Sequence, residues 1–170
     1  MIGPALVRDM ERGDAAAVLR LAADFSQETG LSPPEITPTD FARAAMAEPP
    51  LFQVFVAEPP DGGAPVGYLL LTFAFELRSG AKGGRMEDLY VAPRHRRRGV
   101  GRGLMAAATR AISADGGRWL EWRAAADDDA ALAFYGRIGA KPAAGRTLYL
   151  GPESVASLAR RIDRDRISLR

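Results

Sequence analysis

The chain has no cysteine, and His95 is the only histidine among its 170 residues. The absence of cysteine excludes disulfide bonds, thiolate metal sites and any mechanism that passes through an acyl-cysteine intermediate. The carboxylates that remain as metal ligands show no ligand spacing, so we expect no metal site. His95 lies among arginines in a turn, and we expect it to have a structural role in this loop.

Long apolar runs are also missing. The longest, residues 66–75, is interrupted by Gly67 and Thr72, and it is shorter than the roughly 20 residues that cross a bilayer. The first residues, Met1 to Pro4, lack the basic start and the apolar stretch of a signal peptide. We therefore expect a soluble, cytoplasmic protein with no membrane partner.

A strong excess of one charge is absent as well. Lysine and arginine total 23 against 21 acidic residues, which leaves a net charge of +2. Such a small net charge gives no support to generic nucleic-acid binding. The composition is that of a globular protein, and we expect one domain over residues 1–170, with a core at 4–151 and a C-terminal helix and tail at 152–170.

Hydrophobic periodicity and turn residues predict the order β-α-α-β-β-β-α-β-α-β, followed by a C-terminal helix. The expected strands cover residues 5–8, 51–57, 66–77, 85–91, 119–123 and 147–150. The expected helices begin at Asp14, at Thr39, after the basic turn near residue 98, at residues 127–129 and at Glu153. Ser79-Gly80 and Gly83-Gly84 are expected to mark a turn before the strand at 85–91, and Gly116-Gly117 to end the helix that follows the basic turn. This order predicts a mixed α/β sheet with helices on both faces.

One segment joins a strand end to a helix start through a basic, glycine-punctuated turn. It reads Val-Ala-Pro-Arg-His-Arg-Arg-Arg-Gly-Val-Gly-Arg-Gly-Leu-Met over residues 91–105. A helix N-terminus leaves backbone N–H groups without partners and carries roughly half a positive charge. Gly99 and Gly101 let an anion approach these groups, and the arginines add charged donors. The segment therefore predicts a phosphate-binding site.

Two other interpretations fit parts of this turn. Residues 101–106 fit the dinucleotide pattern G-x-G-x-x-A, with Glu121 near the position of its ribose-binding acid. However, a dinucleotide fold has this motif directly after its first strand, whereas four expected strands precede it here. The arginines at 94–98 could instead form a solvated patch or contact nucleic acid, but no aromatic residues interleave with them for base stacking.

Three segments together resemble a known family. Residues 96–101 read Arg-Arg-Arg-Gly-Val-Gly, residues 86–93 form a strand that carries Glu87 and Asp88, and residues 131–140 form a helix that carries Tyr135. These segments resemble the GNAT superfamily of acyl-CoA-dependent N-acyltransferases, whose signature is Arg/Gln-x-x-Gly-x-Gly/Ala. The Glu-Asp pair, the phrase Thr39-Asp40-Phe41 and the long hairpin strand resemble especially its diamine (spermidine/spermine) and thialysine N-acetyltransferases.

The resemblance implies a GNAT-like splayed central sheet and acetyl-CoA as the acetyl donor, with no metal. It implies direct transfer to a primary amine of a small molecule, either a polyamine, a diamine or a lysine-like amino acid, by a protein that forms a homodimer. The cofactor-binding residues that it implies are Leu89, Tyr90, Val91, Arg96, Arg97, Arg98, Gly99, Val100, Gly101, Arg102, Asp128 and Phe134.

Acetyl transfer needs an acid and a base. An alkylamine with a pKa of about 10.4 is mostly protonated at neutral pH, so a base must accept its proton. Glu87 is the candidate base, acting through an ordered water, and Tyr135 matches the family's general acid for the departing thiolate. From the residues alone, Glu87 could equally be a strand carboxylate and Tyr135 a packing residue beside Phe134.

Carboxylates supply candidate contacts for a cationic substrate. We assign substrate binding to Glu28 and Asp88, and residues 127–129 offer further negative charge, or else stabilise a helix N-terminus. Three alternative functions stay open. They are an acetyltransferase acting on a protein amine or an aminoglycoside, a non-catalytic CoA-binding regulatory module, and a nucleic-acid binder.

Overall fold

The computed structural model describes residues 5–143, 150–151, 153–155 and 157. The chain forms two compact units, Met1–Leu132 and Ala133–Arg170. The strand expected at 147–150 and the helix expected at 153–162 lie largely outside the described residues, and the single domain over 1–170 stays a prediction. No helix in the described part of the chain is long and apolar enough to cross a membrane.

The secondary structure follows the predicted order as far as the second unit. The elements are β1 (Leu6–Asp9), a 3₁₀ turn (Arg12–Asp14), α1 (Ala15–Thr29), α2 (Pro38–Ala45), β2 (Gln53–Glu58), β3 (Gly67–Glu76), β4 (Ala81–Val91), a second 3₁₀ turn (Pro93–His95), α3 (Val100–Ala114), β5 (Leu120–Glu121) and α4 (Asp129–Arg137).

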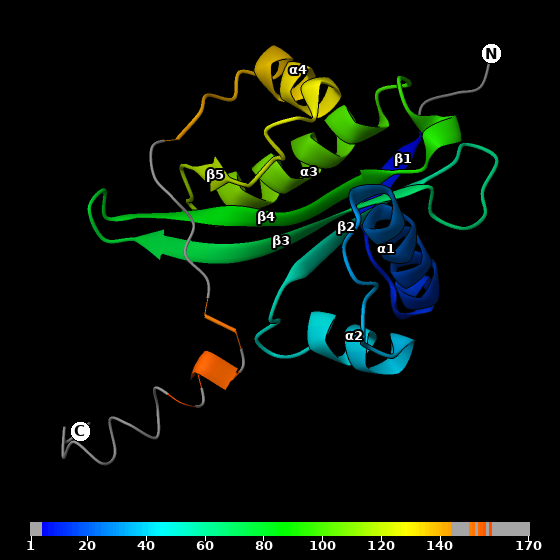
Figure 1. The fold of residues 1–170 in the computed structure, drawn as a ribbon, viewed down its shortest axis with the longest axis horizontal. Coiled ribbons are helices and arrows are strands. Elements are labelled where there is room, and N and C mark those ends of the chain that lie inside the picture. The colour runs from blue at the N-terminus through cyan, green and yellow to red at the C-terminus, as the bar shows by residue number, and fades with distance from the viewer. Residues whose placement is uncertain (1–4, 144–149, 152, 156, 158–170) are drawn as a thin grey trace. The chain divides into compact units, whose positions relative to one another are not determined.

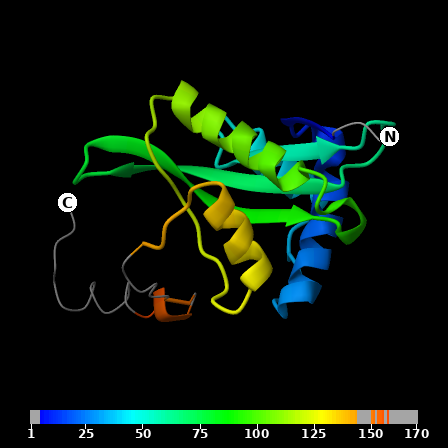
Figure 2. The same ribbon diagram turned by 90° about the horizontal axis from the view of Figure 1, so that it is seen from above.

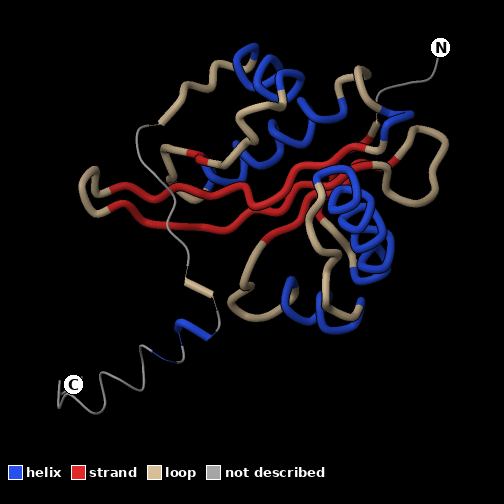
Figure 3. Tube along the Cα trace, in the orientation of Figure 1, coloured by secondary structure: helices blue, strands red, loops and turns tan. Residues whose placement is uncertain are grey.

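The first unit is built on a five-stranded mixed sheet in the order β1-β2-β3-β4-β5. The first four strands pair antiparallel, and β5 runs parallel to β4, because α3 carries the chain back along the sheet. Helix α3 covers one face and α1 and α2 cover the other (Figures 1 and 2), while the strands lie between these layers (Figure 3). The predicted mixed α/β fold is confirmed.

Both faces of the sheet carry apolar core. On the α1 and α2 side, Val18, Leu21 and Phe41 pack in one cluster with Val56 and Tyr68 of the strands. On the other side α3 contacts β1 to β4, and it buries Leu104, Ala108 and Ile112, which recur at helical spacing and form an apolar stripe. Removing such apolar surface from water is the main favourable term in the free energy of folding.

The starts of two helices differ from the prediction. Helix α2 is capped by Thr37, whose Oγ1 accepts the N–H of Asp40 at 3.1 Å, and not by Thr39. Pro38 occupies the first turn, where its missing N–H costs nothing. Asp14 does precede α1, but its carboxylate accepts from the Arg8 guanidinium and from the Glu11 N–H instead of capping the helix.

The predicted turn at Gly83 and Gly84 is wrong, because both residues lie inside β4. A Cβ atom on Gly83 would lie 2.2 Å from the indole ring of Trp119. Glycine is therefore needed at this position for the ring to rest on the strand. The strand expected at 119–123 is also shorter and covers only Leu120–Glu121.

We expect the substitution Gly83→Ala to lower the free energy of unfolding by about 2 kcal/mol, because the new methyl group overpacks against Trp119. Chemical denaturation measures the change. Gly13→Ala is the matched control, since no atom lies within 4 Å of its added Cβ. In a Trp119→Ala background the Gly83→Ala penalty should largely disappear, and an equal penalty in both backgrounds would contradict this account.

Candidate functional site

The turn between β4 and α3 has a backbone shape fixed by two residues. Arg97 has a φ of +63° and Gly99 a φ of +82°, both in the left-handed region. A non-glycine residue in this region costs of order 1 kcal/mol or more, so the surrounding structure must hold Arg97 there. Gly99 is the N-cap of α3. We call residues 94–101 the arginine–glycine turn.

This turn presents unpaired donors. The backbone N–H groups of residues 98–102 donate to no described residue, and the first hydrogen bond of α3 runs from the Gly103 N–H to the Gly99 carbonyl at 2.9 Å. The side chains of Arg97, Arg98 and Arg102 are exposed, and none forms an ion pair within the described part of the chain. The predicted phosphate-binding residues thus lie together at a helix N-terminus, where an anion is stabilised.

Arg96 behaves differently from its neighbours. Its Nη2 donates to Glu28 Oε2 at 2.7 Å, and its Nε donates to the Val91 carbonyl oxygen at 2.7 Å. The structure therefore joins two side chains that the sequence assigned to different ligands, Arg96 to the cofactor and Glu28 to the substrate. The bonded residues are 68 positions apart in the chain.

Tyr90 completes this cluster. Its hydroxyl donates to Glu28 Oε1 at 2.7 Å, and its ring lies 5.7 Å from that of Phe25 and 5.3 Å from the Arg96 guanidinium carbon. Burial by itself raises the pKa of Glu28, but hydrogen bonds from Arg96 and Tyr90 hold it below its ordinary value. Burial, together with the Glu28 carboxylate, raises the pKa of Tyr90 to about 12. At neutral pH the carboxylate is therefore ionised and the phenol stays a donor.

A β-bulge sits at the centre of β4. Leu70 pairs with Asp88 and Leu71 with Met86, so Glu87 is skipped in the register. Thr72 on β3 donates to Glu87 Oε1 at 3.0 Å, and Tyr68, also on β3, donates to Asp88 Oδ2 at 2.9 Å.

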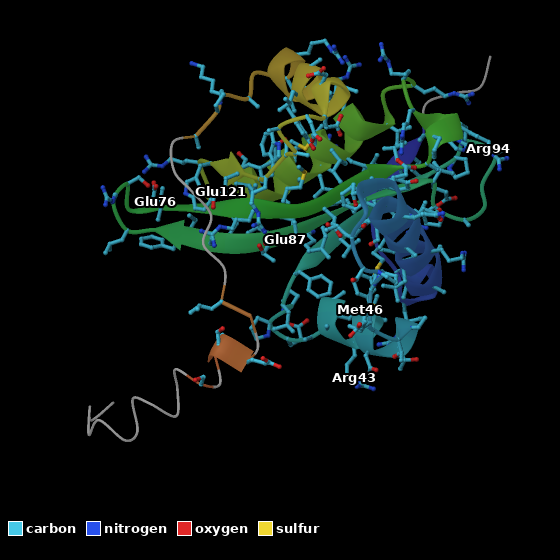
Figure 4. The ribbon with its side chains drawn as sticks, in the orientation of Figure 1. Arg43, Met46, Glu76, Glu87, Arg94 and Glu121 are labelled. Carbon is cyan, nitrogen blue, oxygen red and sulfur yellow. The ribbon has the colours of Figure 1, made fainter. Side chains whose placement is uncertain are left out.

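Tyr68 and Thr72 lie on one face of β3, because side chains alternate along a strand. Their hydrogen bonds therefore place both acidic side chains, although adjacent in sequence, on that same face. It is the face that α1 and α2 cover, where Figure 4 shows Glu87 below β4 and Arg94 beyond the end of the strand.

The two carboxylates have different surroundings. Glu87 is exposed, whereas Asp88 is half-buried. Burial raises the pKa of Asp88, the hydrogen bond from Tyr68 opposes this, and the charge of Glu87 raises it further. Burial and the Asp88 carboxylate likewise keep the pKa of Tyr68 well above its ordinary value, so it remains a donor. The bulge thus places an open carboxylate beside one that holds a proton more readily than an ordinary aspartate.

Part of the outer edge of β4 is open. β5 pairs with β4 only at Gly84 and Arg85, so no described strand covers this edge beyond those residues. The Ala92 N–H donates to Val66 on the β3 side, and backbone groups alternate between the two edges. The N–H groups of Leu89 and Val91 and the C=O of Leu89 therefore point to the open edge, as the splayed strand of the sequence prediction requires, while the Val91 C=O already accepts from Arg96 Nε.

Helix α4 carries the remaining predicted residues. Asp128 Oδ1 accepts the N–H of Ala131 at 2.9 Å, which caps the helix start and gives this carboxylate a local structural role. Phe134 and Tyr135 belong to the second compact unit, are half-buried, and have ring centroids 5.2 Å apart. The helix ends at Arg137, two residues before Gly139, which has a φ of +89°.

Sequence reasoning missed two residues of the site, Tyr68 and Thr72. Both are polar residues within the apolar run at 66–75, and this is the one signal the sequence offered. Their partners depend on the bulge, which no local pattern reveals. Among the residues described here, no cluster of three or more histidine or acidic side chains suits a metal ion.

Comparison with known proteins identifies the family to which this chain belongs. The model of the Acetyltransferase (GNAT) family matches residues 16–140, which run from the first turn of α1 to just beyond the end of α4. The chain belongs to the GNAT acetyltransferase family. The resemblance inferred from the arginine–glycine turn, the central strand and the tyrosine-bearing helix is thereby confirmed.

Relatives at modest identity include members of the group predicted from the sequence. The chain is 31% identical over 103 residues to thialysine N-epsilon-acetyltransferase of Sus scrofa, covering 56% of this chain and 60% of that protein. It is also 31% identical over 101 residues to the spermidine/spermine N(1)-acetyltransferase-like protein 1 of Homo sapiens, covering 56% of this chain and 14% of that protein. The chain thus spans less than two thirds of the length of these curated relatives.

A solved structure shares the fold. An integron cassette protein from the mobile metagenome of V. cholerae superimposes with a TM-score of 0.75 at 18% identity, covering 93% of this chain and 99% of that one. At this identity the likeness supports the GNAT fold of this chain and nothing finer.

We expect two substitutions to move the pKa of Asp88 in opposite directions. Tyr68→Phe removes the hydrogen bond that stabilises the carboxylate and should raise this pKa, whereas Glu87→Gln removes a neighbouring negative charge and should lower it. A carbon-detected NMR titration of the carboxyl groups measures both. Thr72→Val, which removes a donor to Glu87 and to the Arg85 carbonyl but none to Asp88, is the control. Shifts of the same sign in the two variants would contradict the assigned contacts.

Proposed function

We propose that this protein is an N-acetyltransferase that moves an acetyl group from acetyl-CoA directly to a primary amine of a small molecule. The observation that carries the proposal is the helix N-terminus at residues 98–102, whose N–H groups have no described partner, next to a strand with an open edge. Membership of the GNAT family and relatives named for thialysine and spermidine/spermine acetylation support it.

The arginine–glycine turn fits a pyrophosphate. Hydrogen bonds to a charged phosphate contribute about 1.5 to 3 kcal/mol each, so a few donors suffice for micromolar affinity. We assign the pyrophosphate to the N–H groups of residues 98–102 and to the exposed guanidinium groups of Arg97, Arg98 and Arg102. The backbone of residues 89–91 along the open edge would hold the pantetheine arm, and Asp128 and Phe134 complete the proposed set.

The chemistry needs one base and one acid. Glu87, open to solvent and held by Thr72, takes the proton of the substrate ammonium through a water. The freed amine attacks the thioester carbon, so that a C–N bond forms and the C–S bond breaks. Tyr135 gives its proton to the departing thiolate and regains one from the nitrogen of the new amide, which must lose its second proton, while an N–H of the open β4 edge stabilises the oxyanion. No covalent enzyme intermediate is required.

The carboxylate pair supports a cationic acceptor. Glu87 and Asp88 share one face of the sheet, and their charge attracts a polyamine, a diamine or a lysine-like amino acid. The amine that reacts lies beside Glu87 and must lose its proton. A second cationic group of the same substrate can stay charged near Asp88. We assign the acceptor to this class.

We expect purified protein to release CoA thiol from acetyl-CoA when a small primary amine is added. Glu87→Gln should lower kcat about 100-fold with little change in acetyl-CoA affinity, and Tyr135→Phe should slow thiol release. Glu76→Gln is the matched control, because this carboxylate lies at the far end of β3 beside Ser79, and it should retain full activity.

The amine panel for this assay contains spermidine, putrescine, thialysine, an aminoglycoside and a lysine-containing peptide. Turnover with the first three supports the acceptor class. Turnover only with the aminoglycoside or the peptide contradicts that class but not the reaction. Binding of acetyl-CoA without thiol release from any amine contradicts the enzymatic function and favours a CoA-binding regulatory module.

A further inference from the structure

Arg96 joins three parts of the first unit through one guanidinium group. It donates to Glu28 on α1 and to the carbonyl of Val91 at the end of β4, each at 2.7 Å, and it directly precedes Arg97, the first left-handed residue of the arginine–glycine turn. Its remaining face lies over the Tyr90 ring. We call these four residues, Glu28, Tyr90, Val91 and Arg96, the clasp.

We propose that Arg96 is a positioning residue that ties α1 to the arginine–glycine turn, so that donor binding and acceptor binding depend on each other. The inference rests on the proposed function, because it concerns the two substrates of the same site. In this proposal the Arg96 side chain does not contact the phosphate and Glu28 does not contact the amine, which are the roles expected from the sequence.

The clasp uses properties that only arginine has. A guanidinium group is planar and directs several N–H donors in fixed directions, so Nε and Nη2 can bind a carbonyl and a carboxylate at once, while the flat face stacks on an aromatic ring. A lysine ammonium would be one point charge on a flexible stem. The positive charge is matched by Glu28, which the Tyr90 hydroxyl holds in place at 2.7 Å.

On the donor side, the clasp fixes the turn. The bond from Arg96 Nε to the Val91 carbonyl closes the segment 91–96, and two backbone bonds reinforce it, from His95 to Ala92 and from Arg96 to Pro93. The unpaired N–H groups follow directly at residues 98–102. The closure therefore sets where those groups point relative to the open edge of β4, as preorganised binding requires.

On the acceptor side, the clasp holds α1. Glu28 lies one residue before the end of this helix, and α1 packs with α2 over the sheet face that carries Glu87 and Asp88. The Glu28 carboxylate already accepts hydrogen bonds from Arg96 and Tyr90, and the Arg96 charge neutralises it. It therefore attracts a cationic amine less strongly than Glu87 does. Release of Arg96 would free the end of α1 on that face.

A double-mutant cycle separates the clasp from direct contacts. The variants are Arg96→Met, Glu28→Gln and their combination, with the acetyl-CoA Kd measured by calorimetry and the amine KM by thiol release. We expect each single variant to weaken both ligands about 10-fold, and the double variant to be about 10-fold weaker and not 100-fold, because both substitutions break one device.

Arg98→Met is the matched control, since Arg98 is exposed in the same turn and forms no ion pair with any described residue. It should weaken acetyl-CoA alone, and its effect should multiply with that of Glu28→Gln. Arg96→Lys should fall between wild type and Arg96→Met, because one ammonium cannot serve both Glu28 and Val91. If Arg96→Met fails to fold, the cycle is run with Arg96→Lys and Tyr90→Phe.

The outcomes are distinct. The clasp is overturned if Arg96 variants weaken only acetyl-CoA, if Glu28 variants weaken only the amine, or if the effects multiply in the double variant; the proposed function would survive each of these. If folded wild-type protein binds no acetyl-CoA, the proposed function fails and the clasp proposal falls with it.

Discussion

The site depends on unsatisfied backbone hydrogen bonding at the junction of β4 and α3. β4 pairs with β3 along its length but with β5 at only two positions, so its edge beyond Arg85 is open within the described residues. Helix α3 begins close in sequence to the end of that edge, with N–H groups that no described residue accepts. An extended chain of amides ending in a phosphate can satisfy both sets of groups, which is why this arrangement suits a coenzyme A thioester.

The elements that were predicted correctly are those specified by local patterns. The apolar stripe at Leu104, Ala108 and Ile112 predicts both the helix and its buried face, and the composition of residues 66–77 predicts a strand. The turn at residues 94–101 is also local, because arginines, glycines and a helix start are adjacent in the chain. The cap at Thr37 was not predicted, although a proline such as Pro38 is well suited to a first helical turn.

The features that were not predicted depend on partners distant in the chain. Gly83 belongs to a strand because Trp119 packs on it, and the glycine pair alone indicates a turn. The bulge at Glu87 arises from pairing with β3, and it brings Asp88 to the same face as Glu87. Arg96 and Glu28 are 68 residues apart in the chain. No local pattern indicates that they pair, so the sequence predicts a separate ligand for each.

The open edge and the pair of carboxylates thus belong to β4, and the charged turn follows directly after it. The contacts of Arg96 and Tyr90 with Glu28 join this turn and strand to α1. The most direct test of the central claim is an amide NMR titration of the protein with acetyl-CoA. The account predicts that the largest shifts appear at residues 98–102 and at Leu89 and Val91. Saturable binding that leaves these amides unmoved, or no shift at any amide of folded protein, would contradict it.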